Sequence, residues 1–362
     1  MIDRALWFAG AIATAAQGVL KSRGARRRTT GLEINPLPGR PLEWDRGIRH
    51  FPAKTLFHES GWLDFMAMMH PRGKIEYFEI RRNGSRAGYF SALRVKKTVF
   101  SVYGSPLLGS AMYQGPLVDE DVDQAEVIEA LVCLARKNGI AQLELASDWL
   151  SSTVMRELGF KESSSVTHVC PLLKDEASAW AALKGTCRTR IRKAEKSGLV
   201  AEHTSDPAIA DDFYRYFCSV LKQKGVVPSY LVERPRALME CLIPRDQLFA
   251  IRVKYQNQVI GAGFYPHDER AMYYWDSASD AAHLHLCPNE LLHWTAMKLA
   301  ISRGIPAFNI GGGPVPSRFT QKFGGGVVSY TTYRKSFVPL LDTARQLHRF
   351  IVAVSESIGA GA

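Results

Sequence analysis

The sequence lacks the cysteine spacing of a metal site or a disulfide framework. Six cysteines occur in 362 residues, and none forms a Cys-x-x-Cys pair or a Cys/His cluster at zinc-like spacing. Cys133 and Cys241 lie in apolar stretches, where buried thiols are common. We therefore expect a reducing compartment and no structural metal.

Signatures of covalent catalysis are missing as well. The chain has no Gly-x-Ser-x-Gly turn and no convincing cysteine–histidine pair that would mark an activated nucleophile. This absence favours chemistry that depends on positioning the reactants.

No signal peptide or spanning segment of ordinary length is evident. The apolar run 5–20 is short for a spanning helix, which needs roughly 20 residues, and its positive charges follow the run instead of preceding it. On a helix this run forms an apolar stripe next to the basic cluster 21–28, which suits an in-plane helix on an anionic membrane surface. Two other interpretations stay open. The helix packs on the protein's own core, or it is an anchor that leaves the following chain in the cytoplasm.

The positive charge is concentrated in two places. The net charge is +11, and residues 1–30 and 184–196 each carry six basic side chains against one acidic side chain. The rest of the chain is therefore nearly neutral. Such local basicity predicts binding surfaces for phosphate-bearing ligands or anionic lipids.

The chain contains an internal repeat. Residues 126–145 and 291–310, offset by 165, each read as an amphipathic helix ended by glycine and followed by an apolar strand. The same offset pairs downstream residues of two expected final strands: Gly159 with Gly324, Ser164 with Ser329, and Thr167 with Thr332.

A hairpin upstream of each helix repeats too. Residues 75–92 and 248–265 each contain two strand-like runs, and Asn83-Gly84 is a strong type I′ turn signal. Aligning Gly88 with Gly261 gives an offset of 173, so the second copy has about eight more residues here or fewer after the hairpin. Each unit therefore predicts a mixed sheet with a helix that crosses after the central strands.

Helices are expected between the two units. Residues 186–197 predict a helix that stops at Gly198, with an apolar stripe of Cys187, Ile191 and Ala194, and residues 209–223 predict a second helix.

These patterns resemble a known family. The order and spacing are similar to those of the Fem-type peptidyltransferases and the FemAB-like acetyltransferases of the GNAT superfamily, including those encoded near exopolysaccharide and exosortase genes. The resemblance covers roughly residues 50–340, and five segments carry it: Arg190–Leu199, Ala271–Ser279, Cys287–Leu292, Ile305–Gly313 and Arg318–Gly324.

The resemblance implies a fold and an activity. The fold would be α/β with mixed sheets, as two tandem GNAT-like units. The activity would be N-acyltransfer to an amine of a peptidoglycan, glycolipid or exopolysaccharide precursor, in the cytoplasm or peripherally at the inner face of the membrane. A non-catalytic binding or assembly protein that retains the fold is the alternative.

The donor implied by the resemblance is acyl-CoA or aminoacyl-tRNA, with no metal. Simple GNAT enzymes hold a pyrophosphate in a glycine-rich loop where the crossing helix begins, because free backbone N–H groups point outward there. Neither copy in this chain has that loop. The identity of the donor stays open, and a tRNA remains a candidate partner.

Two polar residues at strand ends are the candidate catalytic groups. Asp276 follows Trp275 at the end of a strand and is a candidate to accept a proton from the amine, with an ordinary turn or cap carboxylate as the other interpretation. Asn309 ends another strand just before three glycines, where the family often has aspartate. Tyr230 follows a stretch, Gly225–Ser229, that is expected to act as a lid.

Other candidates would bind substrate. Arg188 and Arg192 lie on the basic helix, and Arg318 and Lys322 would meet phosphate or carboxylate groups. The family often has lysine after the phenylalanine of the last segment, where this chain has Thr320, so Lys322 is the nearest substitute. Remaining contacts are expected from Trp275, Tyr230 and the backbone of Gly311 and Gly312.

The expected organisation has four parts. Residues 1–30 form the amphipathic helix and basic segment, and residues 31–183 the first GNAT-like unit. Residues 184–340 comprise the basic helix and the second unit, and residues 341–362 a C-terminal helix.

Overall fold

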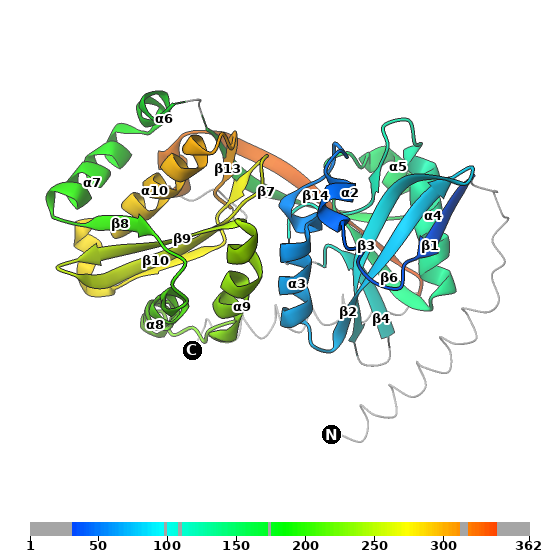
Figure 1. Ribbon diagram of the computed structural model, residues 1–362, viewed down its shortest axis with the longest axis horizontal. Coiled ribbons are helices and arrows are strands. Elements are labelled where there is room, and N and C mark those ends of the chain that lie inside the picture. The colour runs from blue at the N-terminus through cyan, green and yellow to red at the C-terminus, as the bar shows by residue number, and fades with distance from the viewer. Residues whose placement is uncertain (1–30, 98–99, 108–110, 173–174, 312–317, 339–362) are drawn as a thin grey trace, which may run out of the picture. The chain divides into compact units, whose positions relative to one another are not determined.

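The computed structural model describes residues 31–97, 100–107, 111–172, 175–311 and 318–338 (Figure 1). The helices expected in residues 1–30 and 341–362, and the candidate Gly312, lie outside this part of the chain. None of the described helices has the length and apolarity that crossing a bilayer requires.

The described chain forms two compact units, each assembled from separate segments. Unit 1 contains residues 31–53, 70–163 and 331–338, and unit 2 contains residues 54–69 and 164–330. Each unit thus holds a segment that lies outside the contiguous ranges expected for it. The boundaries between the units fall within β7 (Lys161–Pro171) and β14 (Gly326–Ser336). Each of these strands therefore begins in one unit and ends in the other.

Unit 1 is a mainly antiparallel sheet with one parallel pair. Its strand order is β1–β2–β3–β4–β6–β14, with β5 beside β3, and helix α4 packs against β1 and β6. Its elements are β1 (Leu32–Pro36), α2 (Trp44–Ile48), β2 (Gly73–Arg82), β3 (Ser85–Lys97), β4 (Phe100–Ser105), β5 (Leu117–Val118), α4 (Gln124–Lys137), β6 (Ile140–Leu145), α5 (Ser152–Glu157) and the end of β14.

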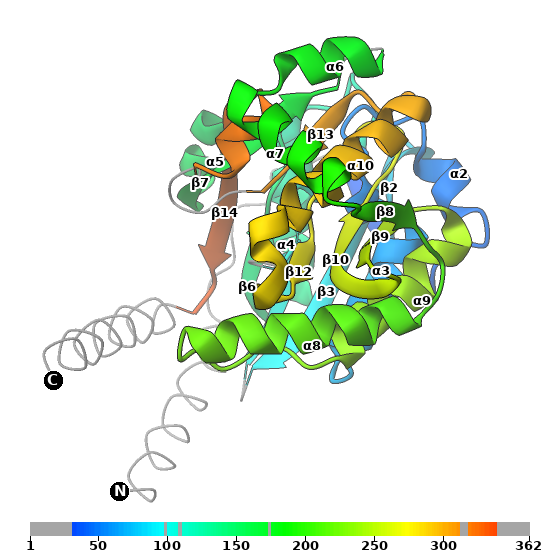
Figure 2. The same cartoon turned by 90° about the vertical axis from the view of Figure 1, so that its left-hand side faces the viewer.

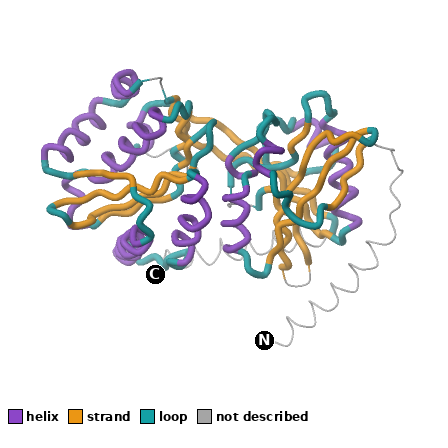
Figure 3. Tube along the Cα trace, in the orientation of Figure 1, coloured by secondary structure: helices purple, strands orange, loops and turns teal. Residues whose placement is uncertain are grey.

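Unit 2 contains two groups of strands, and helices cover both faces of the larger group. The order β12–β10–β9–β8 forms one group of strands, and β7–β13–β11 forms another. Helices α7 and α10 cover one side of β8–β10, while α8 and α9 lie on the opposite side (Figures 1 and 3). Figure 2 shows α8 extending beneath the strands along its whole length.

The helices of unit 2 are α3 (Ser60–Met69), α6 (Glu176–Ala182), α7 (Gly185–Lys196), α8 (Ala208–Gln223), α9 (Glu233–Leu242) and α10 (Pro288–Ser302). Its strands are the end of β7, β8 (Val200–His203), β9 (Leu248–Tyr255), β10 (Gln258–Pro266), β11 (Met272–Tyr273), β12 (Asp276–Ser279), β13 (Ala307–Asn309) and the start of β14. The short 3₁₀ segments are η1 (Leu56–His58), η2 (Ile243–Arg245), η3 (Ala281–Leu286) and η4 (Thr320–Phe323).

The predicted repeat is confirmed in the backbone. Strands β7 and β14 differ in number by 165 at both ends, and the glycines after α4 and α10, Gly139 and Gly304, have φ of 64° and 70°. Such left-handed residues end helices because glycine has no Cβ to clash. The two hairpins turn at Asn83-Gly84 and Gln256-Asn257, whose positive φ values fit the expected type I′ geometry.

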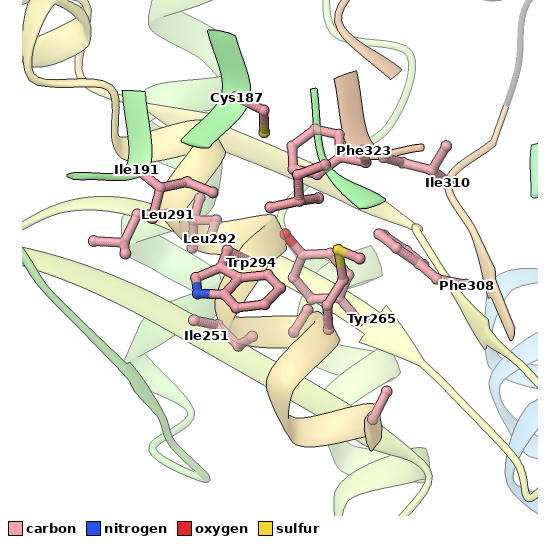
Figure 4. Close-up of a cluster of buried hydrophobic side chains, with 14 of the residues drawn as sticks. Cys187, Ile191, Ile251, Tyr265, Leu291, Leu292, Trp294, Phe308, Ile310 and Phe323 are labelled. Atoms are coloured by element: carbon pink, nitrogen blue, oxygen red, sulfur yellow. The ribbon is translucent and has the colours of Figure 1, made fainter. Parts of the chain in front are cut away.

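The core of unit 2 joins the basic helix to the crossing helix. Cys187, Ile191 and Ala194 of α7 are fully buried, as their spacing predicts. Figure 4 shows the first two near Leu291 and Leu292 of α10, above the strand residues Ile251 and Tyr265. Because the apolar face of α7 packs into this core, the polar face of the helix points outward.

Candidate functional site

A pair of parallel strands separates in the middle of unit 2. Strands β11 and β13 pair at Met272 with Phe308 and at Tyr273 with Asn309, and one further bond joins Tyr274 N–H to the Asn309 carbonyl at 2.8 Å. Beyond this point the two chains take different partners. Trp275 N–H donates to the carbonyl of Phe264 on β10, whereas Ile310 N–H donates to the carbonyl of His168 on β7.

The corresponding strands of unit 1 stay together. Strands β4 and β6 pair from Ser101 with Ile140 to Ser105 with Leu145, and Ala146 N–H adds a bond to the Ser105 carbonyl at 3.2 Å. Unit 2 is therefore the copy in which the ends of the parallel strands diverge, and Asp276 follows directly after the divergence.

Asp276 carries a hydrogen-bonded, partly buried carboxylate. The hydroxyl of Tyr230 donates to its Oδ2 at 2.5 Å, and Ser277 N–H donates to its Oδ1 at 2.8 Å. Burial raises the pKa of Asp276, although the Tyr230 hydrogen bond opposes this shift. A carboxylate with a raised pKa is a stronger proton acceptor, which is the property that a general base needs.

Aromatic rings and one arginine surround this carboxylate. The Tyr230 ring stacks on Phe217 at 4.8 Å between centroids and lies 5.7 Å from Trp275. The guanidinium of Arg234 lies over both Tyr230 and Trp275, at 5.0 and 5.7 Å from their centroids. Tyr230, Trp275 and Asp276, which the sequence proposes separately, are therefore brought into one cluster. Burial and the Asp276 charge raise the pKa of Tyr230, so its hydroxyl stays protonated.

Asn309 is buried and takes part in local hydrogen bonds. Its Oδ1 accepts from the Thr167 hydroxyl at 2.5 Å and from Gly311 N–H at 3.1 Å, and its side chain is 4% exposed. The amide thus fixes the turn after β13. Gly311 has φ of 78° and its carbonyl accepts from His168 N–H, so its backbone is also engaged.

The N-terminus of α10 holds one of the protein's own carboxylates. Glu290 in the first turn is 3% exposed, and its Oε1 lies 3.0 Å from Arg190 Nη1 and 2.7 Å from Lys322 Nζ. Pro288 stands at the first helical position and has no N–H to offer. In unit 1 the carboxylate of Asp123 caps α4 by accepting from Glu126 N–H.

The predicted basic residues have different surroundings. Arg188 donates to the carbonyls of Ala181 and Leu183 at 2.8 and 2.7 Å and so caps the end of α6. The guanidinium of Arg192 lies over the Trp180 ring at 5.3 Å, while Arg318 is exposed. Lys322 is committed to Glu290. Arg192 and Arg318 are therefore the candidates that face solvent.

Three structural features of unit 2 were not predicted from the sequence. Arg234 lies in a helix start with mixed charges, and only the fold brings it to Tyr230. The burial of Glu290 depends on α7 packing over α10. His293 is buried with its Nδ1 2.6 Å from the Tyr265 hydroxyl, and burial lowers the pKa of His293 to about 3.

One group of carboxylates has spacing suited to a cation. Among the described residues, Glu59, Asp268 and Glu269 approach one another closely enough. The ammonium of buried Lys54 already contacts all three. A metal ion would compete with this lysine for the same oxygens.

Comparisons with known proteins agree with this geometry. Residues 181–318 match the family model of an acetyltransferase (GNAT) domain. Among solved structures, the chain is similar to FemX, with a TM-score of 0.67 and 14% identity over 82% of this chain and 96% of that one. None of the curated protein sequences matches the chain significantly.

Two further solved structures share the fold. One is a tandem GNAT protein from the clavulanic acid biosynthesis pathway, with a TM-score of 0.51 and 12% identity over 84% of this chain and 98% of that one. The other is the C-terminal domain of a protein described as a lysylphosphatidylglycerol synthetase from Agrobacterium fabrum, with a TM-score of 0.55 and 12% identity over 85% and 94%.

The predicted fold class is therefore confirmed. Residues 181–318 match a GNAT acetyltransferase domain, and the chain as a whole shares the fold of tandem GNAT proteins. Its GNAT domain, residues 181–318, contains the divergent strands and the cluster of Tyr230, Trp275 and Asp276.

Proposed function

We propose that this protein transfers an acyl or aminoacyl group to the amine of a cell-envelope precursor, with Asp276 as the general base. The observation that carries the proposal is the partly buried Asp276 carboxylate, held by the Tyr230 hydroxyl at 2.5 Å, directly after the point where β11 and β13 stop pairing. At that point the ends of the separated strands lie close to the Asp276 carboxylate, the proposed proton acceptor.

The proposed step forms one bond and breaks another. The acceptor amine attacks the carbonyl carbon of the donor ester or thioester, so a C–N bond forms and the bond from carbon to the donor oxygen or sulfur breaks. Asp276 takes the proton that the amine loses, and the leaving group takes up a proton from solvent. Tyr230 keeps the carboxylate oriented toward the reacting amine.

The helix ends argue against a donor pyrophosphate bound in the manner of simple GNAT enzymes. Glu290 and Asp123 place the protein's own carboxylates at the N-termini of α10 and α4. Arg190 and Lys322 are already paired with Glu290, and Glu126 N–H already donates to Asp123, so a pyrophosphate would have to compete with these carboxylates. The exposed basic side chains of α7 instead favour a donor whose phosphates extend over a helix face, as those of an aminoacyl-tRNA do.

The acceptor is proposed from the resemblance to Fem-type enzymes and from the similarity to a lysylphosphatidylglycerol synthetase domain. Both direct attention to an amine on a peptidoglycan, glycolipid or exopolysaccharide precursor. The apolar and basic residues 5–28 support a location at the inner face of the membrane.

A transfer assay tests the proposal. Purified protein is incubated with aminoacyl-tRNA or acyl-CoA and amine-bearing peptidoglycan or glycolipid precursors, and the product is measured by mass spectrometry. We expect Asp276→Asn to lower kcat about 10²- to 10⁴-fold, the usual contribution of a general base. Asp211→Asn is the matched control, because Asp211 forms only an exposed ion pair with Arg236. Full activity of Asp276→Asn, or no product with either donor, would reject the proposal.

A further inference from the structure

The link between α8 and α9, which Figure 1 shows at the end of α8, carries several large exposed apolar side chains. Val226, Val227 and Leu231 are 50%, 83% and 70% exposed, and all three lie within six residues. We call residues 222–231 the α8–α9 loop. Contiguous exposed apolar groups of this kind mark interaction surfaces in soluble proteins.

The remaining exposed apolar residues do not form such a group. Elsewhere in the described chain they occur singly, apart from the neighbouring pair Val327 and Val328 on β14. The single ones are Leu42, Met68, Val200 and Leu284. The α8–α9 loop is thus distinguished by the density of its apolar side chains, and the β14 pair offers an internal control.

The charged side chains within the loop have one sign. Lys222 and Lys224 are exposed, and no ion pair joins either of them to another described residue. No acidic residue occurs from position 213 to position 232. Two cations at the base of an apolar tip are complementary to an anionic lipid surface, where phosphates meet acyl chains.

Both ends of the loop are held by hydrogen bonds and ring contacts to other described residues, while the Val227 side chain is 83% exposed. Tyr214 donates its hydroxyl hydrogen to the Tyr230 carbonyl at 3.0 Å, and the Tyr230 ring stacks on Phe217. Gly225 has φ of 67° and ends α8, with Val226 N–H bonded back to the Leu221 carbonyl at 2.9 Å. Both ends of the loop are therefore fixed by protein contacts, which reduces the entropic cost of docking.

We infer that the α8–α9 loop docks on an anionic bilayer surface. Val226, Val227 and Leu231 enter the boundary between headgroups and acyl chains, and Lys222 and Lys224 bind lipid phosphates. Tyr230, which donates to Asp276, belongs to the same loop. Docking would therefore bring the proposed general base to an acceptor amine carried by a membrane lipid. This consequence rests on the proposed function, whereas docking itself does not require turnover.

Local insertion is the direct test, because residues 1–30 of the full chain are themselves expected to bind lipid. An environment-sensitive fluorescent amino acid is placed at Val227 in the full-length protein and, as the matched control, at Val327. Vesicles of phosphatidylcholine alone, or with phosphatidylglycerol, are added. We expect a blue shift, and quenching by brominated acyl chains, only for the label at 227 and only with phosphatidylglycerol.

Three results would overturn the inference. The label at 227 is unchanged by anionic vesicles, it is already blue-shifted without lipid because another part of the chain covers it, or the label at 327 responds equally. A response to a protein partner but not to vesicles would also reject the bilayer as the occupant. Inorganic phosphate should leave the signal unchanged, since it offers no apolar phase.

Charge and apolar variants separate docking from catalysis. With the label at 227, we expect Lys222→Glu/Lys224→Glu to weaken the vesicle response about tenfold or more, because each basic residue near an anionic surface contributes about fivefold. Leu231→Asp, which places a charge in the apolar tip, should weaken the response as well. Turnover on a water-soluble amine acceptor should be unchanged in these variants. Lost docking with intact turnover would support the inference, docking without any turnover would reject only the proposed function, and unchanged docking would reject the inference alone.

Discussion

Replacing Glu290 by glutamine should destabilise unit 2 by about 3 kcal/mol. The carboxylate is 3% exposed and is bonded to Lys322 at 2.7 Å and to Arg190 at 3.0 Å. Removing one partner of a buried ion pair costs about 3–5 kcal/mol, because the remaining charge stays buried. The Arg190 side chain is 56% exposed and can turn into water, whereas that of Lys322 is 16% exposed and cannot. The penalty therefore arises mainly at Lys322, which supports the low end of the range.

The assay is a double-mutant cycle in urea. The urea-induced unfolding transition of unit 2 is measured for the wild type, Glu290→Gln, Lys322→Gln and the double variant. Glu240→Gln is the exposed control. We expect a coupling energy of about 2 kcal/mol between Glu290 and Lys322. A coupling below about 0.5 kcal/mol, or an effect no larger than that of Glu240→Gln, would refute the assigned burial of this pair.

The same variant tests the argument about the donor. Without the Glu290 charge, Lys322 and Arg190 can bind an external anion at the start of α10. Glu290→Gln should therefore bind inorganic pyrophosphate more tightly than the wild type, measured by the ligand-induced rise in Tm. Equal binding by both proteins would show that the carboxylate does not exclude phosphate from this helix end.

Other perturbations address stability and the basic surface. Burial lowers the pKa of His293 to about 3 and that of His267 to about 4, so the unfolded chain binds protons below pH 6.5 that the folded chain does not. Between pH 6.5 and 5, each histidine should lower the free energy of unfolding by up to about 1.4 kcal/mol per pH unit, and His293→Gln should reduce this slope in urea titrations. Arg188→Ala should cost about 1–2 kcal/mol through lost carbonyl contacts, whereas Arg192→Ala should spare stability and weaken tRNA binding in a filter assay. Gly325→Ala should be destabilising by more than 2 kcal/mol in thermal unfolding, because φ is 77° and a Cβ would overlap the β7 backbone.

The elements of the repeat were predictable because they depend on local chemistry. An alternating pattern, a turn dipeptide such as Asn83-Gly84 and a helix-ending glycine each act within a few residues. The helix expected over 186–197 is α7, Gly185–Lys196, and the helix expected over 209–223 is α8, Ala208–Gln223. These bounds agree within one residue at each end.

The site was only partly predictable because its partners are far apart in sequence. Tyr230 and Asp276 were each proposed, yet nothing within either segment indicates the hydrogen bond between them. Glu290 reads locally as an ordinary acidic residue in a first helical turn. Its burial between two cations depends on how α7 and η4 meet α10, which residue spacing does not encode.

The strand expected to end at Trp275 and Asp276 illustrates the same limit, because Asp276 instead begins β12. The structure divides it into β11 and β12, and the interruption at Tyr274 and Trp275 is where the chain changes partners from β13 to β10. A continuous apolar run from Ala271 to Trp275 passes through the interruption, so the sequence pattern gives no indication of it.

The difference between the two copies follows from the change in offset. The offset falls from 173 at the hairpins to 165 at the helices. The structure shows that unit 2 is shorter after its hairpin, because residues 106–123 connect β4 to α4 whereas only residues 280–287 connect β12 to α10. In unit 1 the longer link returns as β5 and pairs with β3 at Gly88, where an added Cβ would overlap the Leu117 carbonyl. The aligned Gly261 instead admits Ser279 of β12, so the fourth strand of unit 2 is drawn fully onto β10 and away from β13. A shortened connection thus accounts physically for divergent strands in one copy and a closed pair in the other, which is why we locate the chemistry at Asp276 in unit 2.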